Sequence, residues 1–180
     1  MSTSSGDWSL EAGVTMRVRE VGPDDWVVWR LLRQRSLLED PQAFAASVER
    51  WTGEQDREGN WRARLAAPGA CFVAEHGAAP VGLVAIRPND DDDGQQLISM
   101  WVAPSARGHG VGRALVGRVI AAAAGRPLWL RVLDGNETAI RLYERCGFVL
   151  DDSDPDAEGC RAMHRPEAVA GGDSTSSQRS

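Results

Sequence analysis

One stretch constrains the fold more than any other, because an apolar strand pattern runs straight into a glycine-rich turn and then a helix pattern. Residues 97–102 are almost wholly apolar, glycines follow at positions 108, 110 and 112, and an apolar helix pattern covers residues 111–124. Such a turn leaves the first backbone N–H groups of the helix free, beside the positive end of its dipole. This arrangement is typical of a pyrophosphate site, where Arg107 and Arg113 would add positive charge.

Two other interpretations of the turn are open on these residues alone. It could be a tight strand-to-helix connection without a ligand, or the turn of a dinucleotide-binding fold. Against the second, Arg113 stands where the third glycine of that fingerprint belongs, and the stretch lies in mid-chain behind a predicted antiparallel hairpin. A P-loop is excluded because the chain contains no lysine to reach the terminal phosphates.

Strand and helix patterns are mixed along the rest of the chain. Strands are predicted over residues 15–20, 71–75, 81–87, 97–102, 128–133, 148–150 and 160–164. Helices are predicted over residues 23–38, 54–66, 111–124 and 136–146, with residues 41–53 irregular or short-helical. The mixture indicates an α/β or α+β protein whose first half is largely antiparallel.

Length and composition indicate a single domain. The 180 residues suit one hydrophobic core, and the ends, residues 1–13 and 166–180, are rich in Ser, Gly and Thr and are predicted to be disordered tails around a domain at 14–165. We find neither an apolar run of membrane-spanning length nor a leader-like start, so a cytoplasmic protein is expected. The net charge of −6 argues against a nucleic-acid partner.

Metal-ligand patterns are weak in this sequence. The three cysteines and three histidines are widely scattered, which predicts no metal site and no disulfide framework. The run Asp90 to Asp93 is predicted to be a solvated hairpin tip, because four adjacent carboxylates repel one another and favour water. A cation site is the less favoured interpretation of that run.

Two motifs resemble one family. The run Arg107-Gly108-His109-Gly110-Val111-Gly112 resembles the Arg/Gln-x-x-Gly-x-Gly/Ala motif of the GNAT acetyltransferases. The family's second signature, Asn-x-x-Ala-x-x-Leu-Tyr-x-x-x-Gly-Phe, is matched by Asn136, Ala139, Leu142, Tyr143, Gly147 and Phe148. Residues 38–48 are also similar to the loop between the first two helices in one bacterial branch. The resemblance covers about residues 15–165.

The resemblance implies a fold and a cofactor. The expected fold is a central mixed, mostly antiparallel sheet of about six or seven strands flanked by about four helices. Strands 97–102 and 128–133 should splay at a bulge and form a slot for acetyl-CoA, the co-substrate. The residues implied in cofactor binding are Met100, Trp101, Val102, Arg107, Gly108, His109, Gly110, Val111, Gly112, Arg113, Asn136 and Tyr143.

Two residues carry the chemistry that the resemblance implies. The Val102 N–H would stabilise the oxyanion of the tetrahedral intermediate, and Tyr143, the sole tyrosine in the chain, would protonate the departing thiolate. Asn136 would bind the pantetheine arm. The competing structural roles are a helix cap for Asn136 and a packed helix residue for Tyr143.

The sequence departs from the family at the usual general base. Many relatives carry Glu six residues before the Val102 position, whereas this chain has Gln96, which cannot accept a proton at neutral pH. The base is therefore left open between a water chain, another acid (Glu39, Asp40 or Glu49) and an amine that is already partly neutral. The acceptor-side candidates are Glu39, Phe44, Gln96 and Ser99. Four tryptophans would either line the acceptor side or belong to the core, namely Trp26, Trp29, Trp51 and Trp61.

The favoured function is direct transfer of an acetyl group to a small-molecule amine in a ternary complex, as in a detoxification or antibiotic self-resistance enzyme. The alternative is a non-catalytic, regulatory CoA-binding module of the same fold, for which Gln96 would be a sign of decay and against which Tyr143 argues. Homodimers are common among the similar proteins, so a homodimer is a further expectation.

Overall fold

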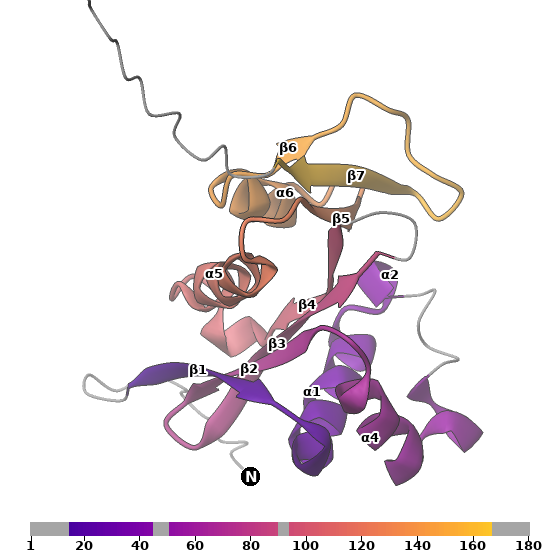
Figure 1. The fold of residues 1–180 in the computed structure, drawn as a ribbon, viewed down its shortest axis with the longest axis vertical. Coiled ribbons are helices and arrows are strands. Elements are labelled where there is room, and N and C mark those ends of the chain that lie inside the picture. Colours follow the sequence, from indigo (N-terminus) through magenta and orange to yellow (C-terminus); the bar gives the residue numbers. More distant parts are fainter. Residues whose placement is uncertain (1–14, 45–50, 90–93, 167–180) are drawn as a thin grey trace, which may run out of the picture.

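The computed structural model describes residues 15–44, 51–89 and 94–166. They form a seven-stranded sheet with the order β1-β2-β3-β4-β5-β7-β6 (Figure 1). The strands are β1 (Met16–Val21), β2 (Ala70–His76), β3 (Ala79–Pro88), β4 (Gln95–Val102), β5 (Leu128–Leu133), β6 (Val149–Leu150) and β7 (Cys160–Arg165). The α-helices are α1 (Trp26–Glu39), α2 (Pro41–Phe44), α4 (Glu58–Ala66), α5 (Val111–Ala123) and α6 (Glu137–Glu144).

The sheet is mostly antiparallel, as expected. Strands β1 to β4 form an antiparallel meander, β4 pairs with β5 in parallel, and β7 pairs in antiparallel fashion with both β5 and β6. The last strand in the chain thus lies between two earlier ones. The mixed sheet and the strand count that the resemblance implied are confirmed.

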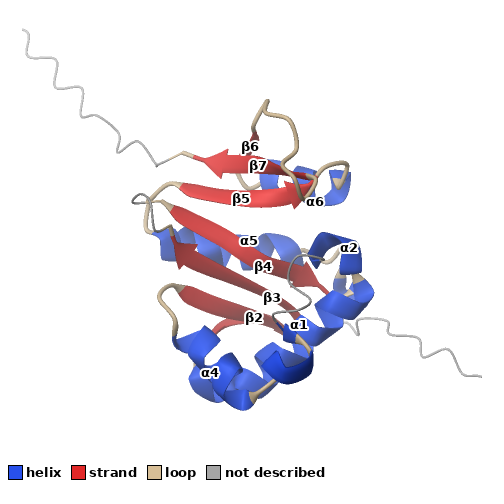
Figure 2. Ribbon diagram, turned by 90° about the vertical axis from the view of Figure 1, so that its right-hand side faces the viewer, coloured by secondary structure: helices blue, strands red, loops and turns tan. Residues whose placement is uncertain are grey.

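Helices cover the sheet on both faces. In Figure 2, α1, α2 and α4 lie in front of the sheet, while α5 and α6 lie behind it. The front layer contributes the fully buried side chains of Trp29, Leu32 and Trp61, and α5 contributes Leu115 and Val119 from the other face. Trp29 and Trp61 therefore belong to the core, and Trp51 stacks on Trp61 with ring centroids 4.7 Å apart.

The predicted helix over residues 54–66 is wrong in its first turn. A short 3₁₀ turn, Gly53–Gln55, comes first, and α4 begins only at Glu58. The interruption has a side-chain cause, because the Asp56 carboxylate accepts hydrogen bonds from Arg30, Gln34 and the Trp61 indole. Arg57 is then extended, with φ −121° and ψ 143°, before the helix starts.

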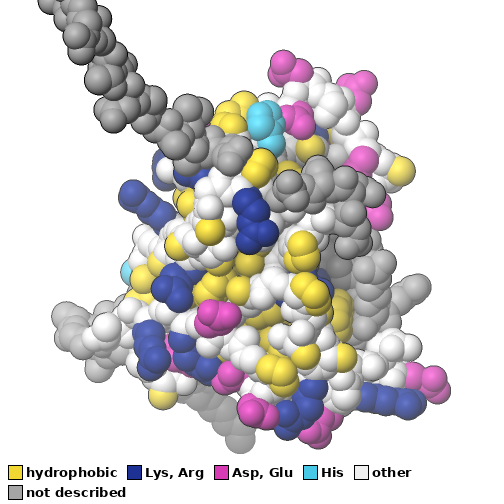
Figure 3. Space-filling model, viewed as in Figure 1, with side chains coloured by type: hydrophobic (Ala, Val, Ile, Leu, Met, Phe, Trp, Pro, Cys, Tyr) yellow, Lys and Arg dark blue, Asp and Glu magenta, His cyan; other side chains and the backbone are white. Residues whose placement is uncertain are grey.

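Some predictions lie outside the described residues. These are Asp90 to Asp93, Glu49 and the two predicted tails apart from Pro166. Between β3 and β4, the Asn89 N–H donates to the Gly94 carbonyl at 2.9 Å. Within the described ranges, no helix combines the length and the apolar character needed to cross a membrane. On the face shown in Figure 3, arginines and acidic side chains are interspersed.

Candidate functional site

A bulge in β4 marks the centre of the candidate site. Across from β4, Leu83 pairs with Trp101 and Ala85 pairs with Ile98, so Ser99 and Met100 together oppose the single residue Val84. Ser99 adopts a left-handed conformation with φ 57°, which is rare for a residue with a side chain. The extra residue bends the strand and redirects its backbone groups. The bulge that the resemblance implied is confirmed.

Beyond their first residues, β4 and β5 separate. Their register contains only two pairs, Gln95 with Leu128 and Gln96 with Trp129, and the strands diverge toward their C-terminal ends (Figure 2). The Ala103 N–H donates to the Val81 carbonyl on the β3 side at 2.8 Å. Because backbone groups alternate along a strand, the N–H and C=O groups of Val102 face the opposite, open side. The splay is confirmed, with Val102 at its wide end.

The N-terminus of α5 has the backbone geometry of an anion site. Gly108 and Gly110 both have φ 80°, and Gly110 precedes the helix as its N-cap. The first intrahelical bond runs from the Ala114 N–H to the Gly110 carbonyl, so it leaves the N–H groups of residues 111–113 at the free helix start. A Cβ atom at Gly108 or Gly110 would meet nothing within 4 Å. Glycine at these two positions thus allows the positive φ angles of the turn, and the space around both is open.

Gly112 has a different role from its two neighbours in the motif. A Cβ atom at this position would lie 3.0 Å from Leu142 Cδ2 and 3.5 Å from Met100 Cε. The missing side chain therefore lets the start of α5 approach both α6 and β4. The sequence motif alone predicted only that glycine clears space for a ligand.

Arg107 is engaged away from the helix start. Its Nη2 atom lies 2.6 Å from Asp40 Oδ2, and its Nε donates to the Val102 carbonyl at 3.0 Å. The same Asp40 oxygen accepts a bond from the Trp101 indole at 2.7 Å. In this structure the Arg107 guanidinium thus forms an ion pair within the chain, and its pairing with a pyrophosphate stays a prediction. Arg113, the third residue of α5, has an exposed side chain.

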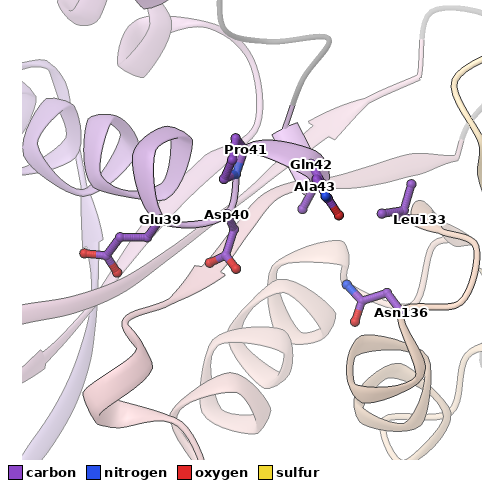
Figure 4. A pocket seen from close by; sticks show the side chains of 7 residues that line it. All are labelled: Glu39, Asp40, Pro41, Gln42, Ala43, Leu133 and Asn136. Carbon is purple, nitrogen blue, oxygen red and sulfur yellow. The ribbon is translucent and has the colours of Figure 1, made fainter.

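A pocket of about 410 Å³ lies beside the wide end of the splay (Figure 4). Its lining residues are Glu39, Asp40, Pro41, Gln42, Ala43, Leu133 and Asn136. In Figure 4, the Glu39 side chain points away from the β5 side of the pocket, whereas the Asn136 side chain points toward α2. The pocket therefore connects the α1–α2 junction with the end of β5 and the start of α6. Its volume is in the range of small-molecule sites.

The acceptor-side candidates do not all meet in this pocket. Glu39 lines it, whereas Gln96 pairs with Arg87, whose side chain bonds the Arg64 carbonyl of α4. Cross-strand partners share a face, so Gln96 faces the α1–α4 layer, about 20 Å of strand before Val102. Ser99 forms the bulge, and the side chain of Phe44 lies outside the described part of the chain. The sequence pointed to Glu39, Asp40 and Asn136, whereas the lining residues Pro41, Gln42, Ala43 and Leu133 were not predicted.

Tyr143 and Asn136 hold α6 in place at the edge of the splay. Tyr143 is buried and packs edge-on against Phe148, with ring centroids 5.8 Å apart. Burial raises the pKa of its phenol well above the ordinary value, so the group is neutral at physiological pH. The Asn136 Oδ1 accepts a bond from the Ala139 N–H at 3.2 Å, which confirms its role as the helix cap. Asn136 also lines the pocket.

The described ranges lack a candidate metal site. They contain no group of three or more His, Cys, Asp or Glu side chains that could hold a metal ion. All three cysteines are free thiols.

Comparison with known sequences relates this chain to acetyltransferases. A profile described as "Acetyltransferase (GNAT) family" matches residues 32–148. A mycothiol acetyltransferase of Thermomonospora curvata is 33% identical over 143 residues, covering 76% of this chain and 44% of the relative. One of Kineococcus radiotolerans is 35% identical, covering 77% and 44%. The chain thus spans less than half the length of these relatives.

Solved structures share the fold at low identity. The yncA protein of Salmonella typhimurium, solved with its cofactor acetyl-CoA, gives a TM-score of 0.69 at 20% identity, covering 89% of this chain and 99% of that one. The PaiA N-acetyltransferase of Thermoplasma acidophilum, solved with coenzyme A, gives 0.65 at 14% identity, covering 84% and 99%. At such identities the likeness establishes the architecture alone.

Proposed function

Because this chain belongs to the GNAT acetyltransferase family, we propose that it transfers the acetyl group of acetyl-CoA to the amine of a small molecule. The observation that carries this proposal is the splay of β4 and β5 next to a glycine-capped helix start. An extended pantetheine arm fits a gap of this kind, because it can bond to strand backbone in place of a missing strand. The N–H groups at the start of α5 suit the pyrophosphate.

The solved structures that share the fold support the same co-substrate. Two of them carry acetyl-CoA or coenzyme A. In this chain, the open space in front of Gly108 and Gly110 fits a pyrophosphate at the turn. Arg113 would supply the positive side chain there, and Asn136 would meet the pantetheine arm at the pocket wall.

The reaction we propose is direct attack in a ternary complex. The Val102 N–H would donate to the thioester carbonyl and stabilise the oxyanion as the N–C bond forms. When the C–S bond breaks, Tyr143 would give its proton to the thiolate sulfur. The incoming ammonium must first lose a proton, and Gln96 cannot take it. We propose that this proton passes to solvent at the pocket, or that the acceptor enters as a neutral amine.

The acceptor belongs to the proposal as well. The relatives are named for mycothiol, a small molecule, and the pocket volume of about 410 Å³ agrees with a small acceptor. A narrower form of the proposal is a detoxifying or self-resistance enzyme that acetylates a toxic amine. Identification of the amine that the enzyme acetylates would decide between the general proposal and this narrower one.

The test is acetyl transfer itself. Enzyme and acetyl-CoA are incubated with a library of small amines, thiol release is followed, and mass spectrometry searches for products heavier by one acetyl group. Amine-dependent thiol release with an acetylated product is the expected result. Tight CoA binding without transfer to any amine would favour the alternative, a non-catalytic CoA-binding module. Absence of CoA binding would contradict both.

A further inference from the structure

Asp40 joins three parts of the molecule. Its backbone N–H donates to the Ser36 carbonyl of α1, and its carbonyl accepts from the Ala43 N–H of α2. Its carboxylate reaches the sheet, where it accepts from the indole of Trp101 in β4 and from the guanidinium of Arg107. One residue thus connects the α1–α2 junction to the C-terminal end of β4.

Arg107 completes the connection from the other side. Its guanidinium bonds Asp40 through Nη2 and the Val102 carbonyl through Nε. Charge-assisted bonds from a planar, two-headed guanidinium are strong and geometrically restrictive. The Val102 backbone, whose N–H would hold the thioester, is therefore tied through one side chain to a residue of the pocket wall.

Trp101 reinforces the same connection. It is buried, at 4% exposure, and Asp40 satisfies its indole N–H. The Arg35 guanidinium lies over its ring, 5.3 Å from the centroid, and Arg35 also pairs with Glu39. The contacts link Glu39, Arg35, Trp101, Asp40 and Arg107 into one continuous network along the pocket wall.

We propose that Asp40 and Arg107 are positioning residues, forming an ionic bracket that holds the acceptor wall, residues 39–43, at a fixed place relative to Val102. The inference rests on the proposed acetyl transfer and adds to it that Arg107 serves the acceptor side. The pyrophosphate is then left to the backbone N–H groups of α5 and to Arg113. Misplacement of a reactant by about 1 Å can cost about 10²-fold in rate, so such a bracket matters for catalysis.

The experiment compares Arg107→Ala, Asp40→Asn and the double variant with two controls. Arg113→Ala removes the exposed cation at the start of α5. Glu39→Gln alters the neighbouring carboxylate, which pairs with Arg35. Calorimetry gives the Kd for CoA, and amide hydrogen exchange reports on residues 36–44. Thiol-release kinetics use tyramine, agmatine, glucosamine and L-cysteine methyl ester as probe amines.

Arg107→Ala and Asp40→Asn are expected to share one phenotype. Exchange at residues 36–44 should rise in both, with no further rise in the double variant, because coupled residues are not additive. KM for the best probe amine should rise by about tenfold in both, with the CoA Kd within about twofold of wild type. Arg113→Ala should instead weaken CoA binding, and Glu39→Gln should leave exchange at residues 36–44 near the wild-type level.

Two outcomes would overturn the bracket. One is a loss of CoA affinity in Arg107→Ala as large as that in Arg113→Ala, which would make Arg107 an anion ligand. The other is unchanged exchange at residues 36–44. The exchange measurement needs neither cofactor nor acceptor, so it tests the bracket even if the wild type binds no CoA, a result that would refute the proposed function separately.

Discussion

At the scale of single residues, Tyr143 carries the sharpest chemical prediction. Tyr143→Phe keeps the ring that packs against Phe148, so the free energy of unfolding should change little. Removal of a positioned acid typically costs roughly 10² to 10⁴ in rate, and water can supply part of that proton transfer. We expect turnover to fall by about tenfold or more, with the Kd for acetyl-CoA nearly unchanged, as measured by single-turnover kinetics and calorimetry.

The control for this variant is its thermal unfolding curve, which should match that of the wild type. A Tyr143→Phe protein with wild-type turnover, under conditions where chemistry limits the rate, would show that another group or a water molecule protonates the thiolate. Because the buried phenol has a raised pKa, it stays protonated through the usual assay range. Any loss of activity between about pH 8 and 9 should therefore come from another group.

Asp56 carries a prediction about acid stability. The guanidinium of Arg30, followed by the Trp61 indole and the Gln34 amide, lowers the pKa of this carboxyl well below its ordinary value. A lowered pKa in the folded state adds stability that is present above the unfolded pKa, near 4, and is lost as the pH falls below it. We expect Asp56→Asn to lower the free energy of unfolding at pH 7 and to shrink its difference from wild type below about pH 4.

Urea unfolding at pH 7 and at pH 3 measures this difference. Asp24→Asn is a suitable control, because the Asp24 carboxylate is fully exposed and pairs with Arg62 at the surface. An Asp56 variant that tracked the wild type at both pH values would show that the hydrogen bonds from Arg30, Gln34 and Trp61 contribute nothing net to stability.

At the scale of helices and strands, the two glycines inside α5 should respond in opposite ways. Gly117 has open space around its Cβ position, so Gly117→Ala should stabilise the protein by about 0.5–1 kcal/mol through helix propensity. Gly112→Ala gains the same propensity but would press on Leu142 and Met100. We expect it to lose that gain and to weaken CoA binding, since α6 and β4 both border the splay.

Thermal unfolding and CoA calorimetry of Gly117→Ala and Gly112→Ala measure these effects on stability and on CoA affinity. Equal stabilisation by the two alanines, with unchanged CoA affinity, would mean that Leu142 moves aside freely and that close packing of α5 on α6 is unimportant for the site.

The sequence predicted elements better than it predicted contacts. The glycine turn, the strand before it and the helix after it follow from local patterns and were confirmed, as was the Asn136 cap. Interruption of the helix at Asp56 depends on Arg30 and Gln34, which lie more than twenty residues earlier. Gln95 and Gln96 extend β4 because neighbouring strands pair with them, against their polar character.

Contacts across the sheet were the least predictable part of the site. The motif placed Arg107 next to the glycine turn, and the structure has it directly before Gly108, whereas its role toward a pyrophosphate stays a prediction. Its partner Asp40 is 67 residues earlier, and no local pattern connects the two. The family resemblance predicted the splay between β4 and β5. Hydrophobic periodicity alone would not have predicted it, because both segments have the pattern of ordinary buried strands.

At the scale of the whole molecule, a bound cofactor should act as a stabiliser. A ligand that spans β4, the start of α5 and the β5–α6 end binds the folded state alone. At a concentration 100 times its Kd it would add about 2.7 kcal/mol. For a protein of this size, that corresponds to an increase in Tm of roughly 5–11 °C.

Differential scanning fluorimetry with CoA, and with AMP at the same concentration as a control, measures the effect. AMP lacks the pyrophosphate and the pantetheine arm and should shift Tm far less. An equal shift with both ligands would place the binding energy in the nucleotide portion and argue against the slot between β4 and β5.

Because β4 and β5 share only two register pairs, we expect the chain to be divisible between them. Gly125, Arg126 and Pro127 lie at the surface just before β5, and only two register pairs follow before the strands part. A cut at that turn would yield two fragments, one with β1 to β4 and α5, the other with β5, α6, β6 and β7. A cofactor that bridges the gap would draw the fragments together, so the fraction assembled would follow its concentration. Fused to the halves of a luminescent enzyme, the pair would work as a sensor for coenzyme A in living cells.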